Sequence, residues 1–230
     1  RSAVQLFGVL DGKHSILDGE YDFFKPYYEM VLGQEDDQIC RNYADLSAEG
    51  LHYSAAFSGG DVAMMNMGSW FISTMIANLQ SGEYDSSLCG NWGMVKYPHA
   101  EGVEAGSTLG TITGLSVTSV SEQKQAAFDF VAWVSGAEGA KVMAETGNFP
   151  ALMNDEVAGI ISGLDGFPTD DASKEALNVS NLYLEVPYAE NVSAINDILD
   201  TYHKSIMNRE ISIDDGIAAM NEEVGKVLAQ

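Results

Sequence analysis

The chain has 230 residues, of which 46% are hydrophobic, so it can form one large or two small domains with a sizeable core. Acidic residues outnumber basic ones by 34 to 11, which gives a formal net charge of −23. This charge argues against nucleic acids and anionic membranes as partners, because both are bound through basic residues. A highly charged surface favours solubility, and we expect a monomer.

One feature of the sequence bears on the origin of the chain, and another on the state of its cysteines. It begins at Arg1 without a methionine, so we expect a processed form or a part of a longer protein. Its two cysteines, Cys40 and Cys89, stand outside any CxxC or Cys/His spacing, which argues against a zinc site. One disulfide and two separate buried thiols both remain compatible with the sequence.

The first fifty residues predict short elements. The apolar run 4–10 indicates a strand or a short helix. Residues 20–32 are rich in aromatic side chains, and we expect Pro26 to interrupt a helix there and a short helix to end at Gly33. A further helix is predicted to follow and to end at Gly50.

The chain is organised around residues 55–76. The apolar run 62–67 is bounded by glycines and predicts a short buried strand, followed by a turn at Gly68 and a helix over 71–79. Trp70 comes at the head of this helix. Its indole either covers the end of the strand in the core or lies at the rim of a cleft as a stacking platform for a flat ligand.

Two more strands are predicted at residues 92–97 and 115–119, and residues 183–188 are expected to be extended. Gly110 and Gly114 lie in a Thr-rich strand pattern. Glycine at such positions indicates either a bulge or a close approach of the backbone to another group.

Helices dominate the rest of the chain. An amphipathic helix is predicted after Ser121, with an inner face formed by Ala127, Phe130, Val131 and Val134. Others are expected at 137–146, 155–164, after Ser173, at 194–207 and from Ser212, which Asp215 follows at capping-box spacing. The pattern is α/β, helix-rich, with short separated strands.

The residues give no sign of catalysis. The four histidines are scattered, and the GxSxG, P-loop and GxGxxG patterns are absent. Neighbouring acidic residues at 36–37, 170–171 and 214–215 fall in predicted turns, loops or caps, where solvation is their expected role. We therefore predict no catalytic residues, no metal and no cofactor. Paired carboxylates for glycoside hydrolysis remain an alternative, because many acids are present.

The remaining residue patterns indicate a ligand-binding site. Flat aromatic residues at 70, 92 and 97 accompany glycine-rich turns, and Asn66, Ser69, Thr111 and Asn191 offer polar groups. Sugars present apolar ring faces with a rim of hydroxyl groups, so a sugar site combines these two kinds of residue.

Four segments resemble, in order, the extracellular solute-binding proteins of ABC importers, the group that includes maltose-binding protein. YADLSAEG with FSGGDVAMMNMGSW resembles the family's block around a Gly-Ser-Trp turn. Three more segments resemble later blocks of the family in the same order: WGMVKYP, the block from STLGTITGLSVTS to GNFPA, and the tail ISIDDGIAAMNEEVGKVL. The resemblance covers roughly residues 43–228, whereas 1–42 fits poorly.

The resemblance implies helix-rich lobes of a periplasmic-binding-protein-like (type II) fold with short mixed strands. Family members are commonly about twice as long, so residues 43–230 would be a C-terminal lobe-like region with hinge-type strands. Trp70 matches the family tryptophan that stacks on a sugar. The implied ligand-binding residues are Ser69, Trp70, Trp92, Gly110, Thr111, Tyr188 and Asn191.

The function implied by the resemblance is capture of a carbohydrate between two lobes for delivery to an ABC permease, without catalysis. The protein would act outside the cytoplasm, in the periplasm or lipid-anchored at the outer face of the membrane. Two alternatives remain: a secreted acidic glycoside hydrolase or its carbohydrate-binding module, and a binding protein for another solute such as a polyamine. A phosphate-containing solute is disfavoured by the few basic residues.

Overall fold

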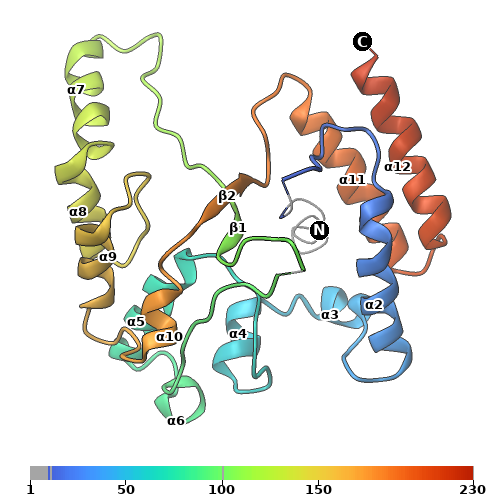
Figure 1. Cartoon of the computed structure of the whole chain (residues 1–230), viewed down its shortest axis with the longest axis horizontal. Helices are drawn as coiled ribbons and strands as arrows, with labels where there is room; N and C mark the ends of the chain where they lie inside the picture. Colours follow the sequence, from blue (N-terminus) through green and yellow to red (C-terminus); the bar gives the residue numbers. More distant parts are fainter. Residues whose placement is uncertain (1–9, 11, 100, 230) are drawn as a thin grey trace. The chain divides into compact units, whose positions relative to one another are not determined.

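A computed structural model describes residues 10, 12–99 and 101–229 (Figure 1). The chain folds into two compact units. Unit 1 comprises Arg1–His52, Pro98–Thr111 and Ser180–Gln230, and unit 2 comprises Tyr53–Tyr97 and Ile112–Val179. Of the apolar run 4–10, only Leu10 lies within the described residues.

Helices form the core of unit 1. The 3-10 helix η1 (Asp22–Phe24) leads into α2 (Lys25–Asp36), which packs against α12 (Ile213–Leu228), and α12 packs against α11 (Val192–Met207). The short helix α3 (Tyr43–Glu49) lies between α2 and the end of this unit's first segment. The buried apolar side chains at the centre are Ile16, Tyr21, Phe24, Tyr28, Leu32, Ile195, Leu199, Ile206, Met207, Ile217, Met220 and Val224.

The ends of these helices follow from local chemistry. The Ser212 hydroxyl accepts a hydrogen bond from the Asp215 N–H at 3.1 Å and so confirms the predicted start of α12. Gly50 has a φ of 64° and ends α3 as predicted. The expected interruption at Pro26 is wrong. Proline occupies the first turn of α2, where its missing N–H has no intrahelical acceptor, and the helix continues past Gly33 to Asp36.

Among the described residues, β1 (Ser107–Gly110) and β2 (Asn181–Leu184) form a two-stranded parallel sheet in unit 1. Ser107 pairs with Asn181, and Gly110 pairs with Leu184. A Cβ at Gly110 would lie 2.5 Å from the Leu182 side chain, so this glycine allows a close approach across the sheet.

Unit 2 contains α4 (Tyr53–Ser58), α5 (Trp70–Ser81), α6 (Ser86–Cys89), α7 (Lys124–Val134), α8 (Ala137–Glu145), α9 (Asp155–Ser162) and α10 (Asp171–Glu175). Helices α5, α7, α8 and α9 lie close to their predicted positions, and α10 begins two residues before Ser173. The sequence analysis did not predict the short helices α4 and α6. One apolar cluster joins α5 with α8 and α9 through Ile72, Ala140, Ala144, Val157 and Ile161. A second, around Phe71, Met75 and Cys89, joins α5 with α6.

The three strands predicted for unit 2 are wrong. Residues 62–67, 92–97 and 115–119 adopt no strand in the part of the chain that the structure describes. A β-strand exists only when a neighbouring chain segment accepts and donates its ladder hydrogen bonds, and apolar patterning does not supply that neighbour. The apolar pattern identified segments that suit an extended conformation, but it did not identify a segment with which each could pair.

Helix α7 also departs from expectation. Ala127, Val131 and Val134 are half-buried as predicted, but Phe130 is exposed. Glycine at position 139 permits a close turn between α7 and α8, because a Cβ there would lie 2.4 Å from the Val134 backbone. None of the described residues of α7 is buried.

The two cysteines, both described, are free thiols. Cys40 is exposed on unit 1, whereas Cys89 is buried in unit 2. Burial, followed by the nearby Asp85 carboxylate, raises the pKa of the Cys89 thiol above its ordinary value. None of the helices within the described residues has the length and apolar content required to cross a membrane.

We predict that iodoacetamide at neutral pH modifies Cys40 rapidly and Cys89 slowly. The thiolate is the nucleophile, and Cys89 combines a raised pKa with burial. Mass spectrometry of the native protein should therefore show alkylation at Cys40 before Cys89, and both sites should react alike in denaturant. Equal native rates would contradict the placement of Cys89 in the core of unit 2.

Candidate functional site

The indole of Trp70 is held at the start of α5 by the glycine two residues before it. A Cβ at Gly68 would lie 2.0 Å from the Trp70 ring, so the indole folds back over the Gly68 backbone. Ser69 lies between them as the N-cap residue, but its side chain does not cap the helix. The absence of a side chain at Gly68 therefore allows this position of the ring, which any larger residue there would displace.

A second contact fixes the edge of the same ring. The Trp70 Nε1–H donates to the Tyr53 hydroxyl at 3.3 Å. Tyr53 is itself anchored, because its ring packs edge-on against Phe71 with a centroid separation of 5.6 Å. Sequence reasoning missed Tyr53, since nothing in the sequence links it to a tryptophan seventeen residues later.

This arrangement makes Trp70 a pre-positioned aromatic surface. The side chain is held by two neighbours yet remains 53% exposed. An aromatic ring that is both fixed and open to solvent can stack on the apolar face of a ligand with little loss of side-chain entropy on binding. The indole is not sealed inside the core, which was the alternative left open by the sequence.

Trp92 has a different environment. It is half-buried and packs edge-on against Phe167, with ring centroids 6.4 Å apart. It also adjoins both apolar clusters of unit 2. These contacts are those of a packing residue in the core.

The backbone that carries Trp92 is tied to α10 by a buried serine. The Met94 N–H donates to the Ser173 Oγ at 2.8 Å, and that hydroxyl donates to the Asp170 Oδ2 at 2.7 Å. The Ser173 N–H donates to the other Asp170 oxygen at 2.9 Å. These hydrogen bonds to Ser173 hold the pKa of Asp170 below its ordinary value.

In unit 1, Gly110 and Thr111 lie at the carboxyl end of β1. The Thr111 hydroxyl donates to the Glu185 Oε2 at 3.2 Å, and the Glu185 N–H donates to the Gly110 carbonyl at 3.0 Å. Polar groups therefore gather where both parallel strands end, a position at which α/β proteins commonly bind ligands. Sequence reasoning missed Glu185, which lies inside the segment 183–188 that was expected to be extended and directly after the observed strand β2.

Tyr188 and Asn191 lie in the loop between β2 and α11. The Tyr188 side chain is fully exposed. The Asn191 Nδ2 lies 3.5 Å from the Val227 carbonyl of α12, at the limit of a hydrogen bond. The seven predicted site residues are thus divided between the units: Ser69, Trp70 and Trp92 belong to unit 2, whereas Gly110, Thr111, Tyr188 and Asn191 belong to unit 1.

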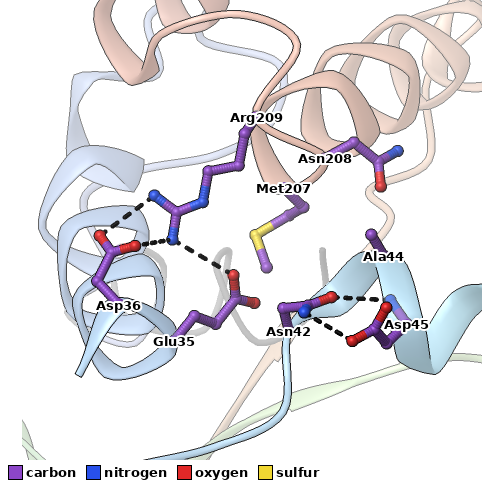
Figure 2. A pocket seen from close by; sticks show the side chains of 8 residues that line it. All are labelled: Glu35, Asp36, Asn42, Ala44, Asp45, Met207, Asn208 and Arg209. Atoms are coloured by element: carbon purple, nitrogen blue, oxygen red, sulfur yellow. Dashed lines mark hydrogen bonds and ion pairs between the residues drawn. The ribbon is translucent and has the colours of Figure 1, made fainter. Parts of the chain in front are cut away.

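A pocket of about 380 Å³ opens in unit 1, where α2 and α3 meet the turn between α11 and α12 (Figure 2). Three acids and one arginine dominate its lining, which consists of Glu35, Asp36, Asn42, Ala44, Asp45, Met207, Asn208 and Arg209. None of the seven predicted site residues is among them.

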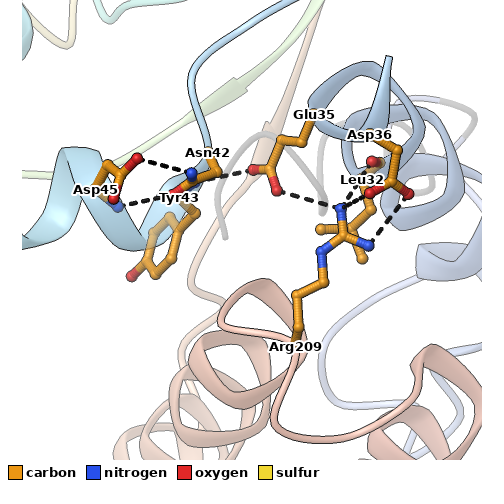
Figure 3. Close-up of polar contacts among 7 residues, drawn as sticks. All are labelled: Leu32, Glu35, Asp36, Asn42, Tyr43, Asp45 and Arg209. Carbon is orange, nitrogen blue, oxygen red and sulfur yellow. Dashed lines mark hydrogen bonds and ion pairs between the residues drawn. The ribbon is translucent and has the colours of Figure 1, made fainter. Parts of the chain in front are cut away.

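The polar groups of this pocket bind one another (Figure 3). Arg209 donates to the Leu32 carbonyl at 2.9 Å and to the Asp36 Oδ2 at 3.2 Å, and its guanidinium lies 3.5 Å from the Glu35 Oε2. The other Glu35 oxygen accepts the Tyr43 N–H at 3.0 Å. This network, the Arg209 joint, connects three helical segments, and we interpret the pocket as a structural feature.

Within the described residues, no group of three or more His, Cys, Asp or Glu side chains could hold a metal ion. Each unit therefore carries its own candidate surface: the Trp70 indole in unit 2 and the polar strand ends in unit 1. The indole can stack on a flat apolar face, and the strand ends can donate and accept hydrogen bonds.

Comparison with known proteins identifies the class. Residues 30–163, more than half of the chain, match the sequence profile of a family described as bacterial extracellular solute-binding protein. The chain belongs to this family. The match confirms the resemblance found in the sequence, and the helix-rich α/β fold agrees with it.

A solved structure lies close to this chain. The crystal structure of a sugar transporter from Rhizobium etli in an open conformation matches with a TM-score of 0.88 and 47% sequence identity. The match covers 98% of this chain and 56% of the Rhizobium chain, so the present chain spans little more than half of that protein. The comparison with curated proteins gives no match.

We predict that Arg209→Ala lowers the free energy of unfolding by about 2 kcal/mol. Most of the effect comes from Glu35, whose side chain is 5% exposed and would lose its cationic partner. Arg209 has a φ of 61°, so Arg209→Gly should be less destabilising than Arg209→Ala by about 1 kcal/mol, because glycine adopts this conformation without strain. Urea denaturation measures both variants.

The control for this prediction is Lys204→Ala, which removes the exposed ion pair with Asp200 on α11 and should leave the urea midpoint unchanged. Equal stability of Arg209→Ala and the parent protein would contradict the Arg209 joint.

We also predict that Ser173→Ala raises the pKa of Asp170 toward its ordinary value, measurable by carboxyl NMR. A depressed pKa in the folded state adds stability above the unfolded pKa of about 4, and this stability is lost as the pH falls through the folded value. The variant should therefore lose more stability at pH 7 than at pH 2. Ser162→Ala, which removes a hydroxyl bonded within α9, is the control. A pH-independent loss would exclude this role for Asp170.

Proposed function

We propose that this chain carries the ligand-binding surface of a carbohydrate importer and captures a mono- or oligosaccharide. The observation that carries the proposal is the Trp70 indole, which Gly68 and Tyr53 hold in place while its side chain stays 53% exposed. The 47% identity to a protein described as a sugar transporter supports the same ligand class.

The chemistry of sugars fits this surface. The C–H face of a pyranose ring is apolar and flat, so it stacks on an indole, whereas its hydroxyl rim requires hydrogen-bond donors and acceptors. Ser69 lies beside the indole, and Thr111, Tyr188 and Asn191 in unit 1 are the proposed further contacts. Gly110 would allow close approach of the backbone. Trp92 would support the site through its packing on Phe167.

The proposed mechanism is binding followed by closure. A ligand closes a two-lobed protein only if it makes contacts in the closed state that are missing in the open state. The loaded protein would then dock on the membrane subunits of an ABC permease. It would act as a monomer outside the cytoplasm, either free in the periplasm or anchored by a lipid at the outer face of the membrane.

The proposal includes no bond-breaking step. A bound sugar should be released with its glycosidic bonds intact, and the site requires no cofactor or metal. Incubation of the protein with oligosaccharides, followed by chromatography, should recover each of them unchanged. Appearance of shorter products would favour the glycoside hydrolase alternative.

We predict that Trp70→Ala weakens sugar affinity by about tenfold, because stacking on an aromatic ring contributes about 1.4 kcal/mol. Gly68→Ala should also weaken binding, although it leaves the ring in the sequence, because the new methyl group displaces the indole. Calorimetric titration with a panel of mono- and oligosaccharides measures both variants.

The matched control is Trp133→Ala, which removes another exposed tryptophan from a helix of the same unit. Its affinity should equal that of the parent protein. If the parent binds a sugar and Trp70→Ala binds it equally well, Trp70 is not part of the site.

A further inference from the structure

Unit 1 contains a buried histidine that the proposed carbohydrate site does not use. His203 lies on α11, on the same buried side as Leu199 and Ile206, and is 7% exposed. The other three histidines, at positions 14, 52 and 99, are exposed within the described part of the chain. An imidazole changes its charge between about pH 5 and 8, so the environment of His203 decides what that change does to the fold.

Two tyrosines from different helices contact the His203 imidazole. The Tyr28 hydroxyl of α2 lies 3.0 Å from the His203 Nδ1, within hydrogen-bond distance. The Tyr43 ring of α3 meets the imidazole edge to face, with ring centroids 6.0 Å apart. Tyr28 is fully buried, whereas Tyr43 is half-buried. His203 therefore connects α3 to the deep core that α2 and α11 form.

The remaining surroundings of His203 are charged on one helix and apolar on another. On α11 itself, Asp200 and Lys204 form an ion pair with each other at 2.7 Å. Helix α12, which packs against α11, contributes the apolar side chains Ile217, Met220 and Val224 to the core. A positive charge on the imidazole would be placed in this largely apolar core, and burial disfavours the charged form of such a group.

Helix α3 is attached to unit 1 through Tyr43. None of the residues of α3 is fully buried, and Tyr43 and Leu46 are half-buried. The Tyr43 side chain packs against the apolar core, and its N–H donates to the Oε1 of Glu35, the acid that α2 contributes here (Figure 3). A helix of seven residues is unstable by itself in water, so these contacts hold α3 in its folded place.

We propose that His203 makes the docking of α3 sensitive to pH, so that uptake of a proton by the imidazole releases α3 from unit 1. An imidazolium has N–H donors at both ring nitrogens and requires water or another acceptor for them. Lifting α3 brings water to His203 without unpacking the fully buried Tyr28. The release of α3 does not depend on which solute the protein binds.

The direction of the effect follows from proton linkage. In an unfolded chain, a histidine binds its proton near pH 6.5. The folded state with α3 docked excludes this proton from His203, so the opened state binds more protons and the docked state loses stability as the pH falls. Between pH 7.5 and 5.5, His203 should raise the equilibrium constant for opening by about tenfold.

Amide hydrogen exchange, corrected for the intrinsic effect of pH, measures the opening of α3. The Leu46 N–H bonds to the Asn42 carbonyl and the Gly50 N–H bonds to the Ser47 carbonyl, so both report on this helix. In the parent protein, their protection should fall about tenfold between pH 7.5 and 5.5. In His203→Gln, whose side chain stays neutral and can still bond to a hydroxyl, protection should change by less than about twofold.

Two further variants complete the test. His14→Gln removes an exposed histidine from unit 1 and should keep the tenfold change of the parent protein. Tyr43→Ala removes the anchor of α3 and should leave Leu46 and Gly50 unprotected at both pH values. Helices α11 and α12 should remain protected in this variant, which would show that unit 1 is still folded.

Three results would overturn the proposal: protection of α3 that does not change with pH in the parent protein, an equal change in His203→Gln, or protected α3 amides in Tyr43→Ala. A change that Glu35→Gln abolishes and His203→Gln retains would identify the carboxylate as the sensor and would also overturn it. Because no sugar is present, failure here is distinct from failure of the proposed carbohydrate binding.

Discussion

An extended segment is stable in a folded protein when its backbone N–H and C=O groups form hydrogen bonds with partners. This constraint determines which extended segments of the chain become strands. In unit 1, residues 107–110 and 181–184 pair and become strands. In unit 2, the apolar segments 62–67, 92–97 and 115–119 have strand-like composition but no ladder among the described residues. The same constraint therefore explains both the observed sheet and the wrong strand predictions.

The candidate site shows that surroundings, more than residue type, give an aromatic ring its role. Trp70 and Trp92 were both among the predicted ligand-binding residues. The Gly68 backbone and the Tyr53 hydroxyl hold Trp70 with half of its side chain in solvent. Trp92 instead packs on Phe167. The difference arises from neighbours that are distant in the sequence.

In this strongly acidic chain, a single cationic side chain contacts several acceptors. Arg209 contacts Asp36, Glu35 and the Leu32 carbonyl, and so joins the turn after α11 to the end of α2. Where no cation is available, backbone and hydroxyl donors take its place, as at Asp170, which accepts two hydrogen bonds from Ser173. The Arg209 contacts join α2 to the turn after α11, and Ser173 joins α10 to the backbone of residue 94.

The sequence by itself determined most of the longer helices, the start of α12, the end of α3 and the family. Ser212 with Asp215 and the glycine at 50 act within a few residues, so local chemistry decides them. The resemblance around the Gly-Ser-Trp turn likewise identified the solute-binding class. Only the tertiary structure decided which extended segments pair, that Tyr53 binds Trp70, and that Phe130 stays exposed. Each of these depends on groups far apart in the chain, and no local pattern specifies which distant group will be the partner.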